Sequence, residues 1–254
     1  MIDIQRAKKA FKEYVGKYNP EDKKVELKIS HILKVSNVAK ELATSLNLDE
    51  EDILLAELIG LLHDIGRFEQ IRLYQTFVDT DSINHGAKGV EVLFEDGLIR
   101  EFIEDTSYDN IIKLAVLNHN RDKIQDGISD RELLHCKIIR DADKIDIFYE
   151  LTVGDKKAIW EKADLSNDII SDEIYREFFE DKVINYKERK TSADILVSHF
   201  AYIYDFNFTS SLKRIADENY LEKLYNRFVF NDEKTMDRFN EIYKESCEYI
   251  KDKR

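Results

Sequence analysis

The sequence is poor in the residues that interrupt helices. It contains one proline, Pro20, and eight glycines among 254 residues. Proline removes a backbone donor and glycine weakens a helix interior, so their scarcity predicts long helices with few irregular segments between them. The fold class predicted for this chain is all-α.

Cysteine and long apolar runs are also scarce. Cys136 and Cys247 are the only cysteines, which is too few for a disulfide framework or a cysteine-based zinc site. No apolar run approaches the length of a membrane span, and the N-terminus has no signal-peptide pattern. These absences predict a cytoplasmic protein that makes no use of a membrane.

Positive charge is in deficit, with 39 Lys and Arg residues against 52 Asp and Glu residues and a net charge of −13. Binding to duplex nucleic acid depends on neutralising phosphates, so this balance argues against a duplex partner. A small phosphorylated substrate remains compatible with it, because bound cations reverse the local sign of the charge. Hydrophobic residues make up 43% of the chain, enough for a sizeable core.

Residues 58–67 are the most informative stretch, and they read LIGLLHDIGR. An almost wholly apolar helical run ends in His63 and Asp64, followed by Gly66 and Arg67. A buried imidazole and carboxylate are costly unless something compensates them, and a divalent metal compensates both. Taken alone, the pair fits an ordinary polar helix end equally well. Arg67 could reach over the same site or be a surface arginine.

Three other histidines have settings that suit a metal site. His31 lies on the apolar stripe of a helix predicted over 25–46, where a core histidine with a hydrogen bond is the alternative. His85 opens a predicted helix, and His119 ends an apolar one. Each of these could singly be a loop or cap residue. A repeated design of apolar helices that end in histidine is typical of a metal site in a bundle core.

The order of these residues, closed by Asp143 on a helix predicted over 130–151, resembles the HD superfamily of metal-dependent phosphohydrolases. The resemblance covers roughly residues 25–150. It implies a first divalent metal held by His31, His63, Asp64 and Asp143. It further implies that Asp64 bridges to a second ion that His85 and His119 bind. The metal could be Mn, Fe, Ni, Mg or Zn. No Gly-Tyr-Pro follows His119, so the cyclic-di-GMP substrate of the HD-GYP branch is not carried over.

The function expected from the resemblance is hydrolysis of a phosphate ester of a nucleotide or small metabolite. His63, Asp64 and Arg67 form the expected catalytic set, and Lys144 is a further candidate to neutralise charge. Two alternatives stay open: an HD-fold di-iron oxygenase with the same ligands, and a nucleotide-sensing or signalling module. The oligomeric state is also open, a homodimer included.

The predicted architecture is an HD-type helical bundle over residues 1–152 and a helical extension over 153–254 that packs on it and could line the substrate pocket. Within the bundle, residues 67–84 have no clear period and are predicted to form a loop or lid. Alternating aromatic residues over 202–208 would also fit a short strand. His135 is expected to be structural or exposed, and Asp194 and His199 to serve the core or the surface rather than chemistry.

Overall fold

The computed structural model describes residues 2–160, 162–180 and 182–253. Within these ranges the chain is helical and contains no strand, which confirms the predicted all-α class. The chain divides into two compact units, Met1–Asp143 and Lys144–Arg254. The division falls inside one long helix, α8 (Asp130–Val153), rather than at the sequence-based boundary of residue 152. That residues 153–254 pack on the bundle and line a pocket stays a prediction.

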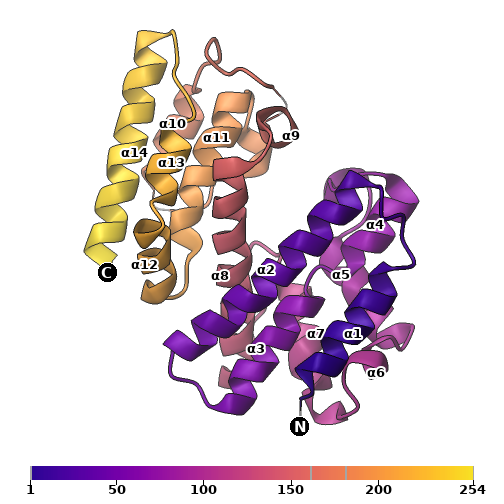
Figure 1. Ribbon diagram of the computed structural model, residues 1–254. Helices are drawn as coiled ribbons and strands as arrows, with labels where there is room; N and C mark the ends of the chain where they lie inside the picture. Colours follow the sequence, from indigo (N-terminus) through magenta and orange to yellow (C-terminus); the bar gives the residue numbers. More distant parts are fainter. Residues whose placement is uncertain (1, 161, 181, 254) are drawn as a thin grey trace. The chain divides into compact units, whose positions relative to one another are not determined.

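The first unit holds seven helices before α8 among its described residues (Figure 1). They are α1 (Ile4–Val15), α2 (Lys23–Ser45), α3 (Glu50–Leu62), α4 (Gly66–Tyr74), α5 (His85–Val90), α6 (Ile99–Phe102) and α7 (Asp109–Asn118). Short 3-10 turns occur at Asp79–Asp81 and Thr106–Tyr108, and a π-helical turn at Glu91–Glu95 follows α5.

The second unit continues from the end of α8. Its helices are α9 (Lys156–Trp160), α10 (Asp172–Phe178), α11 (Ser192–Phe200), α12 (Thr209–Asp217), α13 (Tyr220–Tyr225) and α14 (Glu233–Lys253), with 3-10 turns at Tyr186–Glu188 and Ala201–Asp205. In the described ranges, no helix is both long enough and apolar enough to cross a lipid bilayer.

Acidic and hydroxyl side chains mark where several helices begin. The carboxylates of Asp3, Asp22 and Asp49 accept hydrogen bonds from backbone N–H groups in the first turns of α1, α2 and α3. In α11 the cap is reciprocal, since Thr191 accepts from the Asp194 N–H and Asp194 accepts from the Thr191 N–H. These caps satisfy N–H groups that have no partner within the helix, and so fix where each helix starts.

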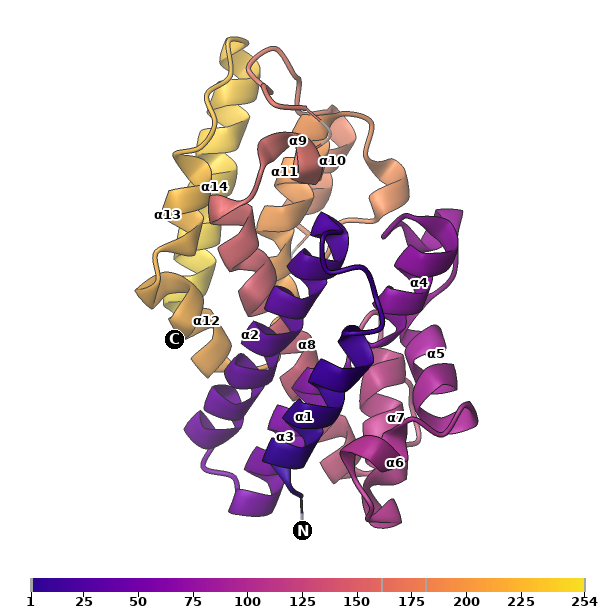
Figure 2. The same ribbon diagram turned by 45° about the vertical axis from the view of Figure 1, so that its right-hand side comes forward.

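Helix α3 is the centre of the first unit. It is apolar on most sides, and Leu55, Leu58 and Leu61 are fully buried. Its neighbour α2 approaches so closely that a Cβ on Gly60 would lie 2.6 Å from the Cα of Ser36. Both ribbon views show α2 and α3 side by side (Figures 1 and 2). The glycine therefore permits the contact that brings the histidines of α2 and α3 together.

A buried carboxylate also joins α3 to its neighbours. Glu57 is 2% exposed, and its two oxygens pair with Lys8 Nζ at 2.6 Å and Lys40 Nζ at 2.9 Å. Burial alone would raise the pKa of Glu57, but the two ammonium groups outweigh it and hold that pKa below its usual value. One paired carboxylate thus links α1, α2 and α3.

The prediction of an irregular segment from residue 67 to residue 84 is wrong for its first half, which forms α4. The buried face of this helix consists of Gly66, Phe68, Gln70 and Ile71. Because a glycine and a polar amide occupy two of these positions, the sequence shows no apolar period there. The remaining stretch, residues 75–84, is irregular apart from the turn at Asp79–Asp81.

In the second unit, the aromatic alternation that would have fitted a strand belongs to a 3-10 turn, Ala201–Asp205. Asp194 and His199 have separate structural partners. The carboxylate of Asp194 accepts from backbone N–H groups, including that of Ser171 at 2.9 Å. The Trp160 indole donates to Nδ1 of His199 at 3.1 Å. Both groups serve the fold of this unit, as the sequence favoured.

Candidate metal centre

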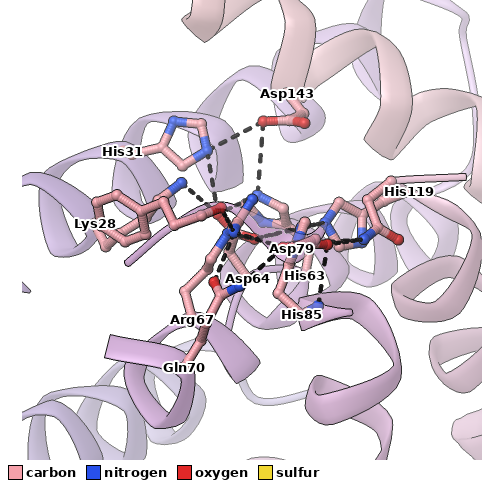
Figure 3. Close-up of polar contacts among 12 residues, drawn as sticks. Lys28, His31, His63, Asp64, Arg67, Gln70, Asp79, His85, His119 and Asp143 are labelled. Carbon is pink, nitrogen blue, oxygen red and sulfur yellow. Dashed lines mark hydrogen bonds and ion pairs between the residues drawn. The ribbon is translucent and has the colours of Figure 1, made fainter. Parts of the chain in front are cut away.

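All six side chains singled out as candidate metal ligands come together in the first unit (Figure 3). They are His31, His63, Asp64, His85, His119 and Asp143. Two groups within this set have one potential ligand atom per residue, all within 4.8 Å of one another: His31, His63 and Asp64, and Asp64, His85 and His119. Asp64 belongs to both groups.

Different helices deliver these side chains. His31 lies on the buried face of α2, and Asp143 lies within α8. His63 and His119 occupy equivalent positions, each as the residue that caps the C-terminus of an apolar helix, α3 and α7. His85 is the first residue of α5. The repeated delivery of histidine at a helix end, noted in the sequence, is therefore present in the fold.

The carboxylate of Asp64 lies between two pairs of imidazoles. Its Oδ2 is 3.7 Å from Nε2 of His31 and 3.8 Å from Nε2 of His63. Its Oδ1 is 3.4 Å from Nε2 of His85 and 3.5 Å from Nε2 of His119. Each oxygen thus faces one pair, which is the arrangement that a carboxylate needs to bridge two ions.

Asp143 completes the half that contains His31 and His63. Its Oδ1 is 3.1 Å from Nε2 of His31 and 3.8 Å from Nε2 of His63. Carboxylate oxygens of Asp64, between α3 and α4, and of Asp143, in α8, therefore face the same two ring nitrogens. A set of two imidazoles and two carboxylates suits Mn, Fe, Ni or Zn.

His85 and His119 form the other half, and their Nε2 atoms are only 3.0 Å apart. Two nitrogens bound to one ion at about 2.1 Å and at right angles to each other would be separated by ~3 Å. Without a proton or a cation between them, two neutral ring nitrogens at this distance present lone pairs to each other. The spacing therefore fits adjacent ligands of one ion.

Backbone carbonyls fix the orientation of two of the rings. Nδ1 of His63 lies 2.7 Å from the carbonyl oxygen of Gly60, and Nδ1 of His119 lies 2.7 Å from that of Val116. A carbonyl oxygen can only accept, so each Nδ1 carries the proton and donates it. Each Nε2 is then left with its lone pair toward Asp64, as metal binding requires.

His85 is oriented by a side chain instead. Its Nδ1 lies 2.8 Å and 2.7 Å from the two carboxylate oxygens of Asp79. Asp79 belongs to the 3-10 turn that precedes α5. A carboxylate behind a ligand imidazole is a common partner in metal sites, where it fixes the ring and raises its basicity.

The ionisation states also suit a metal. Burial lowers the pKa of His63 to about 3, against the attraction of Asp64 and Asp143. Burial likewise lowers the pKa of His85 to about 4. Burial opposes ionisation of Asp64, but Lys28 and the surrounding imidazoles outweigh it and hold that pKa well below its usual range. Neutral imidazole and ionised carboxylate are the forms that bind metal.

Two atoms at the centre are buried without a hydrogen-bond partner among the described residues: Nε2 of His63 and Oδ1 of Asp64. Both are acceptors, so neither can satisfy the other. An unpaired buried acceptor costs about 1–3 kcal/mol. A divalent cation would satisfy both atoms at once, and the residues present therefore fit such an ion.

Two cations lie beside the bridging carboxylate. Nζ of Lys28 is 2.8 Å from Oδ2 of Asp64, and Nε of Arg67 is 3.6 Å from Oδ1. The sequence analysis named Arg67 and missed Lys28. A signal for Lys28 was present, because it lies three residues before His31 and hence on the same helical face. Lys28 and Arg67 supply the positive charge that an anionic ligand would need.

Arg67 is largely buried, which removes the surface alternative. Its NH1 donates to Oε1 of Gln70 at 2.6 Å, to the carbonyl of Phe77 at 2.7 Å and to Oδ1 of Asp79 at 2.9 Å. Nε is buried without a hydrogen-bond partner among the residues that the structure describes. The guanidinium therefore lies between Asp79 and Asp64.

Two further residues from the sequence analysis have roles of their own. Lys144 belongs to the second unit, where Nζ pairs with Asp205 at 2.6 Å. His135 is 1% exposed, and its Nε2 lies 3.0 Å from Oδ1 of Asp52. The structural role expected for His135 fits this contact.

A comparison with family models gives an independent result for the same stretch of chain. The HD domain model matches residues 29–147, which include all six clustered side chains. Residues 29–147 are therefore an HD domain. Comparisons with curated proteins and with solved structures return no match. The HD domain is thus identified by the family model together with a cluster of His and Asp residues that could hold a metal.

Proposed function

We propose that this HD-domain protein is a metal-dependent phosphohydrolase that cleaves a phosphate ester of a nucleotide or other small metabolite. The observation that carries the proposal is the position of Asp64, with one oxygen toward His31 and His63 and the other toward His85 and His119. Paired ions bridged by a carboxylate are a common basis for phosphoryl chemistry.

In this proposal His31, His63, Asp64 and Asp143 hold one divalent ion, and Asp64, His85 and His119 hold the second. Mn, Fe, Ni or Zn suits this imidazole-rich set better than Mg, which prefers oxygen ligands. Such ions would supply Lewis acidity and lower the pKa of water toward neutrality. His63 and Asp64 are the catalytic pair because both would touch the ions directly.

The charge around Asp64 supports a phosphate ester over molecular oxygen as the substrate. Lys28 and Arg67 both approach the carboxylate, and both side chains are mostly buried. Buried cations attract an anion strongly and have no comparable attraction for a neutral gas. Arg67 therefore stays in the proposed catalytic set, and Lys28 joins it as a source of positive charge.

The proposed partner is a small phosphorylated molecule rather than duplex nucleic acid, in keeping with the net charge of −13. A homodimer is compatible with this proposal.

The test uses the full-length protein loaded with Mn²⁺ and a panel of phosphate monoesters and diesters, nucleotides included. We expect inorganic phosphate or a nucleoside monophosphate to be released, and metal analysis to find two ions per chain. His63→Gln should lose both activity and metal. His135→Gln changes a buried histidine outside the cluster and should retain both.

The same preparation separates the alternatives. Oxygen uptake by the Fe²⁺-loaded protein, without phosphate release, would indicate an oxygenase. Saturable nucleotide binding without turnover would indicate a sensing module. Either result, with metal bound in full, would overturn the hydrolase proposal.

A further inference from the structure

Three of the clustered histidines, His63, His85 and His119, are oriented in two different ways. His63 and His119 cap the C-termini of α3 and α7, where the last carbonyl groups of a helix have no partner within it. Each ring uses the carbonyl three residues earlier, that of Gly60 or Val116. His85 begins α5, where free N–H groups rather than carbonyls are available. Its ring needs an acceptor from elsewhere.

Asp79 provides that acceptor. Both of its oxygens lie within 2.8 Å of Nδ1 of His85, and Oδ2 also accepts from the backbone N–H of His85 at 3.3 Å. An ionised carboxylate cannot donate, so Nδ1 must carry the proton. Nε2 of His85 then presents its lone pair to Oδ1 of Asp64 at 3.4 Å.

Two residues of α4 hold Asp79 in turn. NH1 of Arg67 and Nε2 of Gln70 each donate to Oδ1 of Asp79 at 2.9 Å. Gln70 is fully buried, and it also bonds Ser82 at 2.8 Å and the carbonyl of Ile83 at 3.1 Å. Hydrogen bonds from α4 therefore hold residues 79–83 in place. Helix α4 begins at Gly66, two residues after Asp64.

We infer that Arg67, Asp79 and His85 form a positioning relay for the second metal ion, with Asp79 as a positioning residue that orients His85 and Arg67 acting through Asp79. The inference rests on the proposed two-metal site. Asp79 contacts the Nδ1 side of the ring, whereas the ligand atom is Nε2 on the opposite side, so Asp79 supports the ligand and does not replace it.

The relay gives Arg67 a second task, in addition to attracting the phosphate ester. All three hydrogen bonds from its NH1 go to groups of the protein. A guanidinium suits this task because it keeps its charge and holds several acceptors in a fixed plane. A lysine at this position would offer a point charge and would hold Asp79 less firmly.

The experiment is a titration of the metal-free, full-length protein with MnCl₂ by calorimetry, with metal analysis after desalting. The variant Asp79→Asn keeps the shape but places an amide where Arg67, Gln70 and His85 donate. Loss of such a partner typically weakens metal binding by about 10- to 100-fold. We expect one Mn²⁺ to bind as in the wild type and the second to bind that much more weakly.

The control is Asp81→Asn, the same change two residues along in the same turn. Asp81 is exposed and bonds only its neighbour Thr80 among the contacts seen for its carboxylate, so both ions should bind as in the wild type. Arg67→Lys should weaken only the second ion, by about tenfold or less. Arg67→Lys retains the positive charge. If circular dichroism shows that Asp79→Asn does not fold, the Mn²⁺ titration of Arg67→Lys tests the relay instead.

The results separate this inference from the proposed function. Wild-type affinity for both ions in Asp79→Asn would overturn the relay and leave the hydrolase proposal intact. So would an Arg67→Ala variant that binds both ions with wild-type affinity, since Arg67 would then act on the substrate alone. A wild-type protein that binds two ions without hydrolysing any ester would overturn the hydrolase proposal alone.

Discussion

Both units bury ionisable side chains, but they satisfy them differently. In the second unit, Asp168 and Asp194 accept hydrogen bonds from backbone N–H groups, and His199 accepts from an indole. In the first unit, Nε2 of His63 and Oδ1 of Asp64 face other acceptors. Burial alone therefore does not mark a functional group. Buried acceptors that converge without a protein donor do, because a bound cation can satisfy them together.

The largest effect is expected from the change at the centre of this contrast, Asp64→Ala. Removing the shared carboxylate should abolish Mn²⁺ binding at both positions and cost several kcal/mol of transition-state stabilisation, or about a thousandfold or more in kcat. The far-ultraviolet circular dichroism should remain helical, since the apolar face of α3 is untouched. Retained turnover would remove Asp64 from the catalytic set.

A buried carboxylate of the second unit should behave in the opposite way. Asp194 accepts from the N–H groups of Ser171, Lys190 and Thr191. Asp194→Ala would leave these donors unpaired and should lower the free energy of unfolding by about 2–3 kcal/mol. Chemical denaturation measures this loss, and metal analysis of the folded variant should still find both ions. Loss of metal from the folded variant would contradict the proposed difference between the two units.

The pH dependence of stability offers a third test, at His199. Burial, with Arg189 nearby, lowers the pKa of His199 to about 3. The unfolded chain has a histidine pKa of about 6.5, so it binds the proton first as the pH falls. The contribution of a neutral His199 is thus complete above pH ~6.5 and is lost progressively toward pH ~3. By pH 5 the loss should amount to about 2 kcal/mol.

Replacement by glutamine keeps an acceptor for Trp160 but cannot titrate. The variant His199→Gln should therefore show a flatter fall in unfolding free energy between pH 7 and 5, by that same amount. The measurement is made with a chelator and repeated with Mn²⁺, because metal protects only the histidines of the first unit. A His199 contribution that vanished with Mn²⁺ would show that this residue also responds to metal.

The smallest effect is expected within the first unit, at a carboxylate that forms ion pairs with two lysines. Glu57 is as buried as Asp64, but it pairs with both Lys8 and Lys40. Lys8 is half-exposed and Lys40 remains in Lys8→Met, so this variant should lose about 1 kcal/mol or less. Both Mn²⁺ ions should stay bound. A change in metal content would contradict the comparison, because it would mean that metal binding also depends on a carboxylate that is paired with lysines and lies outside the cluster.

The sequence was sufficient for the parts of the molecule that follow a regular pattern. The apolar stripe containing His31 and the apolar run before His63 predicted α2 and α3 and their inward-facing histidines. The helices follow from the periodicity of apolar residues, and the role of the histidines follows from the cost of burying a polar group. Scarce proline and glycine likewise predicted a helical chain, and the structure is helical.

The parts that the sequence did not predict depend on contacts between distant residues. Helix α4 was not predicted because its buried face includes Gly66 and Gln70. Each of these residues makes a close contact with a residue that is distant in the sequence. A Cβ on Gly66 would lie 2.3 Å from the carbonyl oxygen of His85, and Gln70 holds the turn that contains Asp79. Asp79 itself lies in a 3-10 turn of three residues, which is too short to show a periodic pattern. Only the fold brings it to His85.

The histidine caps of α3 and α7 have an electrostatic consequence. The peptide dipoles of a helix place roughly half a negative charge at its C-terminus, and both helices end at the histidine that would bind metal. The candidate centre thus combines ligand atoms with the negative ends of two helices. Metal affinity should then be coupled to fraying of the last turn, at residues 60–63 and 116–119. Slower hydrogen exchange of these amides on addition of Mn²⁺ would report this coupling in solution.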